Sequence, residues 1–295
     1  MKLVSIVVAT YKRDRDLKKA LDSLGLQNYP SMEIVLVDDN ADAQWNKKVS
    51  EIANTFRENF PNIPLIYIAN DTNQGSAETR NIGINAANGE YITFLDDDDI
   101  YLPEKIKKQT EFMENGKYDY SITDLILYSE NDKEIDKRIR SYIKDTSVPA
   151  LTKYHLKYHI TGTDTMMFKK EYLTKVGGFP PINVGDEFYL MHRAINGGGA
   201  FGYLPGCQVK AYVHTGEGGL SSGDGKIKGE NALYEYKKTF FGELNSKDVR
   251  YIKVRHYAVL AFAYIRMHKI LPALKYATLG FLVSPITFFK LLQER

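Results

Sequence analysis

Four consecutive aspartates, Asp96 to Asp99, follow the apolar run at residues 91–95. Carboxylates this close repel one another, and a fold keeps them ionised when a cation lies among them. Carboxylate oxygens favour Mg²⁺ or Mn²⁺, and Mg²⁺ leaves coordination positions for water and substrate phosphates. Continued strand geometry would point Asp96 and Asp98 to one side and Asp97 and Asp99 to the other. The run predicts a divalent metal site; the alternative is an acidic surface loop.

These aspartates come at the end of one of four predicted strands, at residues 3–9, 33–37, 65–69 and 91–95. Each run is short, rich in Val, Ile and Leu, and followed by polar residues. Stretches with helical periodicity at 16–26, 47–60 and 77–87 separate them, so we expect an open α/β sheet, mostly parallel. Ligands bind beyond the carboxyl ends of such strands. One rim should therefore gather the polar residues at 10–13, 38–40, 70–71 and 96–99.

The remaining pattern is less regular. We expect a helix at 103–115, a strand at 120–128, a hairpin or solvated excursion at 130–140, a strand at 165–168, and helices at 170–176 and 187–196. Glycine-rich segments at 197–199 and 216–229 predict loops. Helical periodicity then continues from residue 230 to the end.

Composition narrows the class of protein. The 295 residues carry 39 Lys and Arg against 37 Asp and Glu, which argues against a nucleic-acid binder. Cys207 is the one cysteine, which excludes an internal disulfide and a cysteine-rich metal site and suits a reducing, cytoplasmic setting. The run at 3–9 lacks a cleavage site, so we expect a first strand rather than a signal peptide. No apolar run reaches the roughly 18 residues that a membrane-spanning helix needs.

Four segments in order resemble those of inverting family-2 glycosyltransferases with the GT-A fold. They read SIVVATYKR at 5–13, IVLVDDN at 34–40, NQGSAETRN at 73–81 and GEYITFLDDDD at 89–99, with Pro103 beyond. The likeness covers about residues 1–220. It implies transfer of a hexose or N-acetylhexosamine from a nucleotide-sugar donor, most often a UDP-sugar, with inversion. The acceptor would be a hydroxyl of a glycan or lipid-linked molecule, in bacterial-type cell-surface polysaccharide synthesis.

The resemblance assigns the donor site. It implies that Thr10, Tyr11 and Asp39 hold the uracil and ribose and that Arg13 and Arg80 lie at the diphosphate. A carboxylate accepts hydrogen bonds from ribose hydroxyls, an aromatic ring offers a stacking face, and a guanidinium matches phosphate oxygens. Four of these residues also have a structural alternative. Thr10 could cap a helix and Tyr11 could be a packed ring. Asp39 could be a turn carboxylate, and Arg80 could form a surface ion pair.

The resemblance also divides the aspartate run. The family's Asp-any-Asp-Asp form maps onto Asp96, Asp98 and Asp99. It implies Asp98 as a ligand of Mn²⁺ or Mg²⁺ and Asp96 at the metal or the ribose, while Asp97 adds charge beside the donor without an assigned role. His214 would complete the metal shell or touch the diphosphate, unless it is a structural histidine. The cation would offset the charge that develops on the leaving nucleoside diphosphate.

Inverting transfer needs a base for the acceptor hydroxyl. The family carries it in an acidic pair before a helix, which here is Asp186-Glu187, in reverse of the usual Glu-Asp order. We expect Asp186 first, because some relatives have Gly-Asp at this point, with Glu187 as the other candidate. The alternative is a helix N-terminus that acidic side chains stabilise.

Because helical periodicity continues from residue 230 to the end, we expect a catalytic domain at 1–229 and a helical region at 230–295. Residues 1–115 would bind the nucleotide, and 116–229 would hold the acceptor and a lid loop. The basic and apolar residues of the tail suit an anionic membrane surface, at the inner face of the cell membrane. The alternative is a helical hairpin packed on the catalytic domain or on a second subunit, in a homo-oligomer. The rival function is a non-catalytic sugar-nucleotide or carbohydrate-binding protein.

Overall fold

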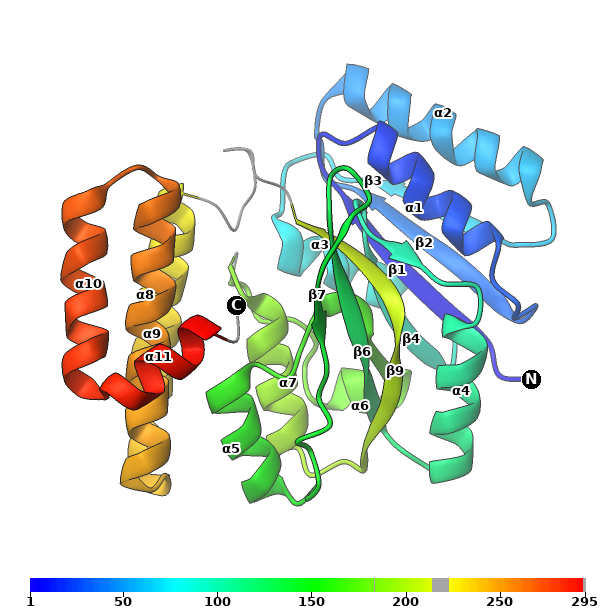
Figure 1. Cartoon of the computed structure of the whole chain (residues 1–295). Coiled ribbons are helices and arrows are strands. Elements are labelled where there is room, and N and C mark those ends of the chain that lie inside the picture. The colour runs from blue at the N-terminus through cyan, green and yellow to red at the C-terminus, as the bar shows by residue number, and fades with distance from the viewer. Residues whose placement is uncertain (183, 214–222, 294–295) are drawn as a thin grey trace. The chain divides into compact units, whose positions relative to one another are not determined.

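The structure is a computed structural model that describes residues 1–182, 184–213 and 223–293. Its strands form one sheet in the order β3-β2-β1-β4-β8-β6-β9-β5, and β7 pairs with β6 (Figure 1). The strands are β1 (Val4–Thr10), β2 (Met32–Asp38), β3 (Leu65–Ala69), β4 (Tyr91–Asp96), β5 (Ile100–Tyr101), β6 (Tyr120–Ser129), β7 (Glu134–Arg138), β8 (Met166–Lys169) and β9 (Phe201–Val213).

The helices follow the expected alternation with strands in the first half of the chain. They are α1 (Arg15–Gly25), α2 (Ala43–Asn59), α3 (Ser76–Ala86), α4 (Lys105–Gly116), α5 (Val148–Tyr158), α6 (Lys170–Lys175), α7 (Asp186–Asn196), α8 (Gly223–Lys238), α9 (Ser246–Arg266), α10 (Ile270–Val283) and α11 (Pro285–Gln293). Short 3₁₀ turns, η1 (Thr163–Thr165) and η2 (Phe241–Glu243), complete the list. The strands and helices expected in the first 200 residues are confirmed, with shifts of a few residues at their ends.

Strands β3, β2, β1 and β4 are parallel, as the strand–helix alternation predicts. Thr10 lies opposite Asp38, and Ala9 lies opposite Asp96, so the polar strand ends meet at one rim. One face of these strands packs on the apolar sides of α1, α2 and α4 in a continuous core. The other face receives α3, where a Cβ on Gly83 would lie 2.4 Å from Val7 Cγ1. Glycine there lets α3 approach the sheet closely.

Beyond β4 the sheet changes direction. Strand β8 is antiparallel to β4 and to β6, while β6 and β9 are parallel and β7 forms a hairpin with β6. The register pairs Thr93 of β4 with Met167 of β8. Because the two strands run in opposite directions, the residues just before β8 lie beside those just after β4. This pairing brings Asp164 to the rim.

The chain divides into two compact units. One contains residues 1–151 and 160–214, and the other contains 152–159 and 215–295. In the second unit α10 packs along α9, and α8 packs on α9 as well (Figure 1). The helical tail is confirmed, while the domain division at 229/230 stays a prediction. No helix in the described ranges is long and apolar enough to cross a membrane.

The expected glycine-rich loop at 216–229 is wrong for its second half, because α8 begins at Gly223. Glycine costs a helix about 1 kcal/mol relative to alanine, but α8 buries Ile227 and Leu233. This packing outweighs the unfavourable propensity. The first half of the expected loop and His214 lie outside the described residues.

Candidate active site

The carboxylate of Asp39, just after β2, organises the loop that leads to α3. Its Oδ1 accepts from Asn70 Nδ2 at 2.8 Å and from the Gln74 backbone N–H at 2.7 Å, and its Oδ2 accepts from Gly75 N–H at 2.9 Å. Gly75 has a φ of 80°, which favours glycine. The structure therefore places Asp39 at the rim, where it ties the ends of β2 and β3 to the start of α3.

Thr10, Tyr11 and Arg13 meet the aspartate run from the end of β1. Asp97 Oδ2 accepts from Thr10 Oγ1 at 2.7 Å and from Tyr11 N–H at 3.3 Å. Arg13 Nε lies 3.5 Å from Asp97 Oδ1, and its Nη1 pairs with Asp98. Burial raises the pKa of Asp97 to about 6, although Arg13 and Thr10 oppose the shift. Asp97, which had no assigned role, thus holds the end of β1 against the turn after β4.

Arg80 on α3 joins the aspartate run to the acidic pair. Its Nη2 donates to Asp96 Oδ1 at 2.6 Å, and its Nη1 donates to Asp186 Oδ2 at 2.7 Å. Burial alone would lower the pKa of Arg80, but Asp96 and Asp186 outweigh it and raise that pKa above its usual value. The Phe179 ring lies 5.4 Å from the guanidinium carbon. One largely buried cation, 12% exposed, therefore brings together two groups that are about 90 residues apart in the sequence.

The two carboxylates of the acidic pair have different surroundings. Asp186 is buried, and its Oδ2 also accepts from Ser76 Oγ at 3.2 Å. Its Oδ1 accepts from the Glu187 backbone N–H at 3.0 Å. Burial and the neighbouring Asp186 raise the pKa of Glu187 to about 8. Asp186 is held by its partners, while Glu187 has the proton affinity of a base near neutral pH.

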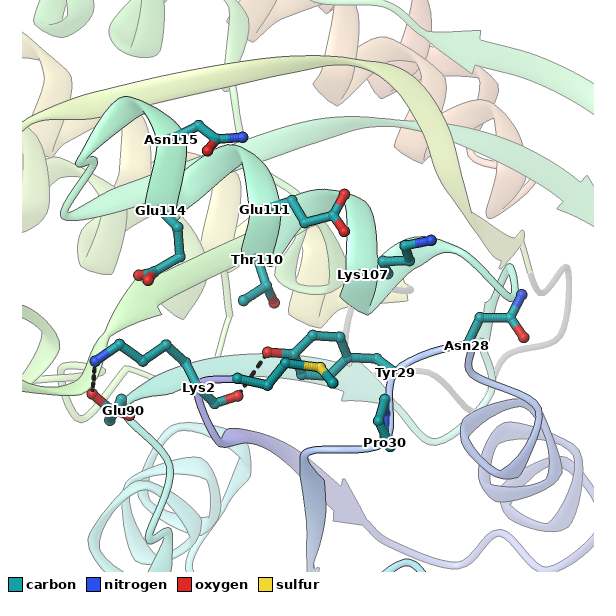
Figure 2. Close-up of a pocket in the computed structure, with 11 residues that line it drawn as sticks. Lys2, Asn28, Tyr29, Pro30, Glu90, Lys107, Thr110, Glu111, Glu114 and Asn115 are labelled. Atoms are coloured by element: carbon teal, nitrogen blue, oxygen red, sulfur yellow. Dashed lines mark hydrogen bonds and ion pairs between the residues drawn. The ribbon is translucent and has the colours of Figure 1, made fainter.

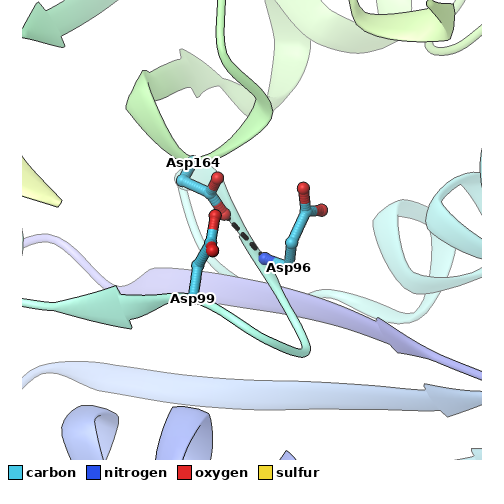
Figure 3. A group of neighbouring side chains, drawn as sticks. All are labelled: Asp96, Asp99 and Asp164. Atoms are coloured by element: carbon cyan, nitrogen blue, oxygen red, sulfur yellow. Dashed lines mark hydrogen bonds between the residues drawn. The ribbon is translucent and has the colours of Figure 1, made fainter. Parts of the chain in front are cut away.

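Strand β4 ends at Asp96 and the chain turns at once, with Asp99 N–H donating to the Asp96 carbonyl at 3.1 Å. The expected alternation of the four aspartates is therefore wrong. Instead, one carboxylate oxygen from each of Asp96, Asp99 and Asp164 lies within 4.8 Å of the others (Figure 3). Asp98 points to Arg13.

Asp164 was missed by the sequence reasoning. It stands three residues before Met167, and Asp96 stands three residues after Thr93, so the antiparallel register sets them side by side. Its Oδ1 accepts from the Asp96 backbone N–H at 2.6 Å (Figure 3). An aspartate directly before the predicted strand at 165–168 was the available signal, but it carried meaning only once that strand was paired with β4.

Burial and mutual repulsion dominate the acidic group formed by Asp96, Asp99 and Asp164. Burial and Asp96 raise the pKa of Asp164 to about 7, and burial and Asp164 raise the pKa of Asp99 well above its usual value. Three hard oxygen donors whose charges repel suit a divalent cation such as Mg²⁺ or Mn²⁺. The residues present therefore fit the expected type of metal, with Asp96 shared between this group and the predicted Asp96 and Asp98 pair.

A buried polar layer supports this acidic group. Lys105 Nζ donates to Thr93 Oγ1 at 3.0 Å and lies 3.3 Å from the Tyr101 hydroxyl. The Tyr101 hydroxyl donates to the Asp164 carbonyl at 3.2 Å. On the other side, Asp99 Oδ1 accepts from Tyr212 N–H at 2.8 Å, near the end of β9. The Tyr212 bond ties the turn after β4 to β9, which leads toward residue 214.

A cavity of about 750 Å³ lies at the opposite edge of the sheet (Figure 2). It is lined by residues before β1 and β4 and by α4, among them Lys2, Glu90 and Glu114. In a parallel sheet the carboxyl ends of the strands form the ligand site, and this cavity adjoins the amino ends. We therefore assign the site to the rim and not to the cavity.

Two solved structures share the fold of this chain. TarS 1-349 of S. aureus in complex with UDP-GlcNAc matches with a TM-score of 0.60 at 16% identity, over 96% of this chain and 91% of that one. The mannosyltransferase PcManGT of Pyrobaculum calidifontis, in complex with GDP-Man and Mn²⁺, matches with a TM-score of 0.63 at 17% identity, over 99% and 83%. The expected GT-A-type α/β fold is confirmed.

Curated relatives are glycosyltransferases as well. An uncharacterized glycosyltransferase of Methanocaldococcus jannaschii, MJ1057, is 28% identical over 268 residues, which cover 89% of this chain and 88% of the relative. The UDP-Glc:alpha-D-GlcNAc-diphosphoundecaprenol beta-1,3-glucosyltransferase WfaP of Escherichia coli is 34% identical over 133 residues, 45% of this chain and 49% of its own. The match thus spans about half the length of WfaP.

The family assignment rests on more than half of the chain. The sequence profile named Glycosyl transferase family 2 matches residues 5–177, which include most of β1, the aspartate run and Asp164. The Asp186-Glu187 pair, Phe179 and Tyr212 lie beyond the matched segment. The chain therefore belongs to glycosyl transferase family 2 and is a glycosyltransferase.

Proposed function

We propose that this glycosyltransferase moves a hexose or N-acetylhexosamine from a UDP-sugar to a hydroxyl of a glycan or lipid-linked acceptor, with a divalent metal and with inversion. The observation that carries the proposal is the Arg80 bridge from Asp96 to Asp186, at 2.6 and 2.7 Å. A phosphate-binding guanidinium, an acidic metal group and a proton acceptor then share one site. This is the set of groups that a direct displacement at a sugar needs.

In this proposal the ends of β1 and β2 receive the nucleoside. The Tyr11 ring is exposed beside the buried Thr10 and offers a stacking face. Asp39 lies beside the same rim and would accept hydrogen bonds from the ribose or the base. Arg13 and Arg80 would bind the diphosphate, as two guanidinium groups on either side of the aspartate run. The complex of TarS with UDP-GlcNAc supports a uridine nucleotide.

Asp96 and Asp98 would hold the metal, and Asp99 and Asp164 would support Asp96 from the buried side. Mn²⁺ is present in the PcManGT complex, which supports this metal or Mg²⁺. When bound, the cation supplies electrostatic stabilisation of the leaving diphosphate. Arg13 and Arg80 also balance part of the carboxylate charge. His214 stays a predicted further ligand.

The acidic pair would supply the base, and its contacts favour Glu187 as the group that takes the acceptor proton. Both oxygens of Asp186 already accept hydrogen bonds, from Arg80, Ser76 and the backbone. Asp186 would position Arg80 and raise the proton affinity of its neighbour. Glu187, with its pKa raised to about 8, would remove the proton as the hydroxyl attacks.

The acceptor follows from the relatives only by analogy. The printed activity of WfaP is transfer of glucose to a GlcNAc that is linked to diphosphoundecaprenol. A lipid-linked sugar at the inner face of the cell membrane, in polysaccharide assembly, is therefore the acceptor that we propose. Fold and family set the chemistry but not the sugar.

The test is a panel of UDP-glucose, UDP-GlcNAc and GDP-mannose, each with and without Mn²⁺. We expect metal-dependent thermal stabilisation by a UDP-sugar, together with slow hydrolysis or transfer to a lipid-linked sugar. Glu187→Gln should keep the stabilisation and lose turnover. Stabilisation by no nucleotide would refute the donor site. Stabilisation without turnover, with every acceptor tried, would instead favour the non-catalytic binding protein.

A further inference from the structure

Large apolar side chains cover the solvent side of the two last helices. We call this set the exposed apolar face. Its members are Ile270, Leu271, Leu274, Phe281, Leu282, Ile286, Phe289 and Leu292. On α10 the exposed positions recur at three- and four-residue intervals and form one stripe of the helix, in which Lys275 and Thr278 stand between the apolar side chains. An ordinary surface helix shows the opposite pattern, with polar residues outward.

The contact between α10 and α9 does not use the exposed apolar face. Helix α10 rests on α9 through the buried Ala273 and Gly280. Tyr276 stacks on Tyr264 across the same contact, with ring centroids 5.6 Å apart. The small residues allow close approach of the two helices, and the large apolar residues point away from α9. Contiguous apolar surface of this kind marks an interaction site.

Aromatic rings gather where α10 meets α11. Phe281, Phe288 and Phe289 make mutual edge-to-face contacts, with centroids 6.0 to 6.4 Å apart. Phe281 and Phe289 are exposed. Gly280 lies against the Phe288 ring, where an added Cβ would sit 3.0 Å from it. The cluster fixes the angle between the helices and presents two rings on the same exposed apolar face.

Positive charge predominates in the sequence around this face. Residues 249–293 contain no Asp or Glu, and Glu294 is the next carboxylate in the sequence. Their Lys and Arg residues are Arg250, Lys253, Arg255, Arg266, Lys269, Lys275 and Lys290. Lys275 and Lys290 stand on the exposed sides of α10 and α11, and Arg266 and Lys269 flank the turn before α10. Lys269 also lies 3.5 Å from Asp224 of α8. Apolar side chains beside cations suit the surface of an anionic bilayer, where charged headgroups lie next to apolar acyl chains.

The length of the helices decides how they would meet a bilayer. Helix α10 has 14 residues, which rise about 21 Å at 1.5 Å each, while a hydrocarbon core is about 30 Å thick. The helix is too short to span the hydrocarbon core, and its other side packs on α9. It is suited to lie in the plane of the interface with one side immersed.

We propose that the exposed apolar face docks the protein on an anionic phospholipid membrane. A second copy of the chain is the competing occupant, but two-fold pairing of this face would bring its cations against identical cations, because residues 249–293 contain seven Lys and Arg and no Asp or Glu. An anionic lipid surface balances them directly. Docking goes beyond the transfer reaction and is measured without it. It would place a lipid-linked acceptor and the enzyme on the same surface.

The experiment measures partition of the whole chain onto sedimenting vesicles, made of phosphatidylcholine alone or of phosphatidylcholine with phosphatidylglycerol. The test variant combines Leu271→Glu and Ile286→Glu, at positions that are 81% and 84% exposed. The matched control combines Leu26→Glu and Ile135→Glu, which are 63% and 57% exposed in the first unit. Both variants lose one Leu and one Ile and gain the same charge. All four sites are exposed, so both should fold like the wild type, which circular dichroism checks.

We expect wild type and control to bind the anionic vesicles, more weakly as salt rises, and the test variant to partition about tenfold or more weakly. Lys275→Gln with Lys290→Gln should weaken binding to anionic vesicles and leave the weak binding to neutral ones unchanged. Failure of the wild type to bind anionic vesicles, or equal loss in both double variants, would overturn the proposal. A wild-type dimer that the test variant dissociates, without vesicle binding, would assign the face to a second copy.

Discussion

At the rim of the sheet each carboxylate is bound to specific partners, whereas the exposed apolar face of α10 and α11 offers area and diffuse positive charge. The single side chain of Arg80, for example, contacts both Asp96 and Asp186. The side chains of Leu271 and Ile286 are more than four-fifths exposed and cannot form such a network, because they carry no polar atoms. Hydrogen-bonded charges in a buried site depend on one another, while apolar contributions add roughly in proportion to area. A single change should therefore be severe at the rim and mild on the face.

The largest effect should come from Glu187→Gln. Losing a general base lowers kcat by about 10²- to 10⁴-fold, while affinity for the nucleotide sugar should stay within a few-fold. Steady-state kinetics and donor binding on the same preparation check this. Asp186→Asn is the matched variant and should affect donor affinity as well, because Asp186 holds Arg80. A greater loss of kcat in Asp186→Asn with normal donor binding would move the base to Asp186.

The pH profile should report the same group. Burial and Asp186 raise the pKa of Glu187 to about 8, so near pH 7 most of it is protonated and unable to accept a proton. As pH rises toward 8, the ionised fraction grows, and kcat/KM should increase by about tenfold per unit below that pKa and then level off. A profile that is flat from pH 6 to about 8 would contradict this assignment.

Arg80→Ala should destabilise the rim and weaken the donor site together. Arg80 is only 12% exposed, and its removal leaves Asp96 and Asp186 without their cation. We expect a loss of about 3 kcal/mol in the free energy of unfolding, measured by urea denaturation. Arg80→Lys keeps the charge but cannot span both carboxylates, so it should lie between wild type and Ala. Unchanged stability in Arg80→Ala would mean that the bridge contributes little.

A comparison of Asp98→Ala with Asp164→Asn tests whether Asp96 and Asp98, or instead Asp96, Asp99 and Asp164, bind the metal. We expect Asp98→Ala to abolish the Mn²⁺-dependent part of donor binding. Asp164→Asn should weaken the affinity for Mn²⁺ by about tenfold, because Asp164 positions Asp96 through the hydrogen bond from the Asp96 backbone N–H. Calorimetric titration of Mn²⁺ in the presence of UDP-sugar measures both. The reverse order would assign the cation to Asp96, Asp99 and Asp164.

The smallest effect should come from one change on the exposed apolar face. Leu271→Thr removes part of an apolar side chain and no charge, so vesicle partition should fall only about threefold. Ile286→Thr should behave alike, and the double variant should show the product of the two. A loss of more than about tenfold from either one would point to a specific pocket in a partner instead of a lipid surface.

Much of the parallel half of the sheet was predictable from local sequence. Runs such as residues 3–9 and 91–95 are apolar on both sides because helices cover both faces, and their polar ends mark the rim. The meeting of Asp97 with Thr10 follows from parallel neighbours ending together. These features need only the parallel sheet that the strand–helix alternation already predicts, even though β1 and β4 are not consecutive strands.

The rest depended on contacts that are distant in sequence. Asp164 reaches the acidic group only through the antiparallel pairing of β8 with β4, which no local pattern specifies. The turn at Asp97 and Asp98 broke the expected alternation, because backbone bonding to Asp96 ended the strand. Helix α8 forms despite the low helix propensity of its glycines, because it buries Ile227 and Leu233. The expected role of His214 stays a prediction, since it lies outside the described residues.

The double contact of Arg80 has a consequence for proton balance. Its positive charge opposes the rise in the pKa of Glu187. An anion that binds this guanidinium neutralises that charge, so Glu187 binds its proton more tightly and the protein takes up protons from the buffer. Calorimetric heats of nucleotide binding should then vary with the ionisation enthalpy of the buffer. The bridge thereby couples the occupancy of the phosphate position to the protonation of Glu187.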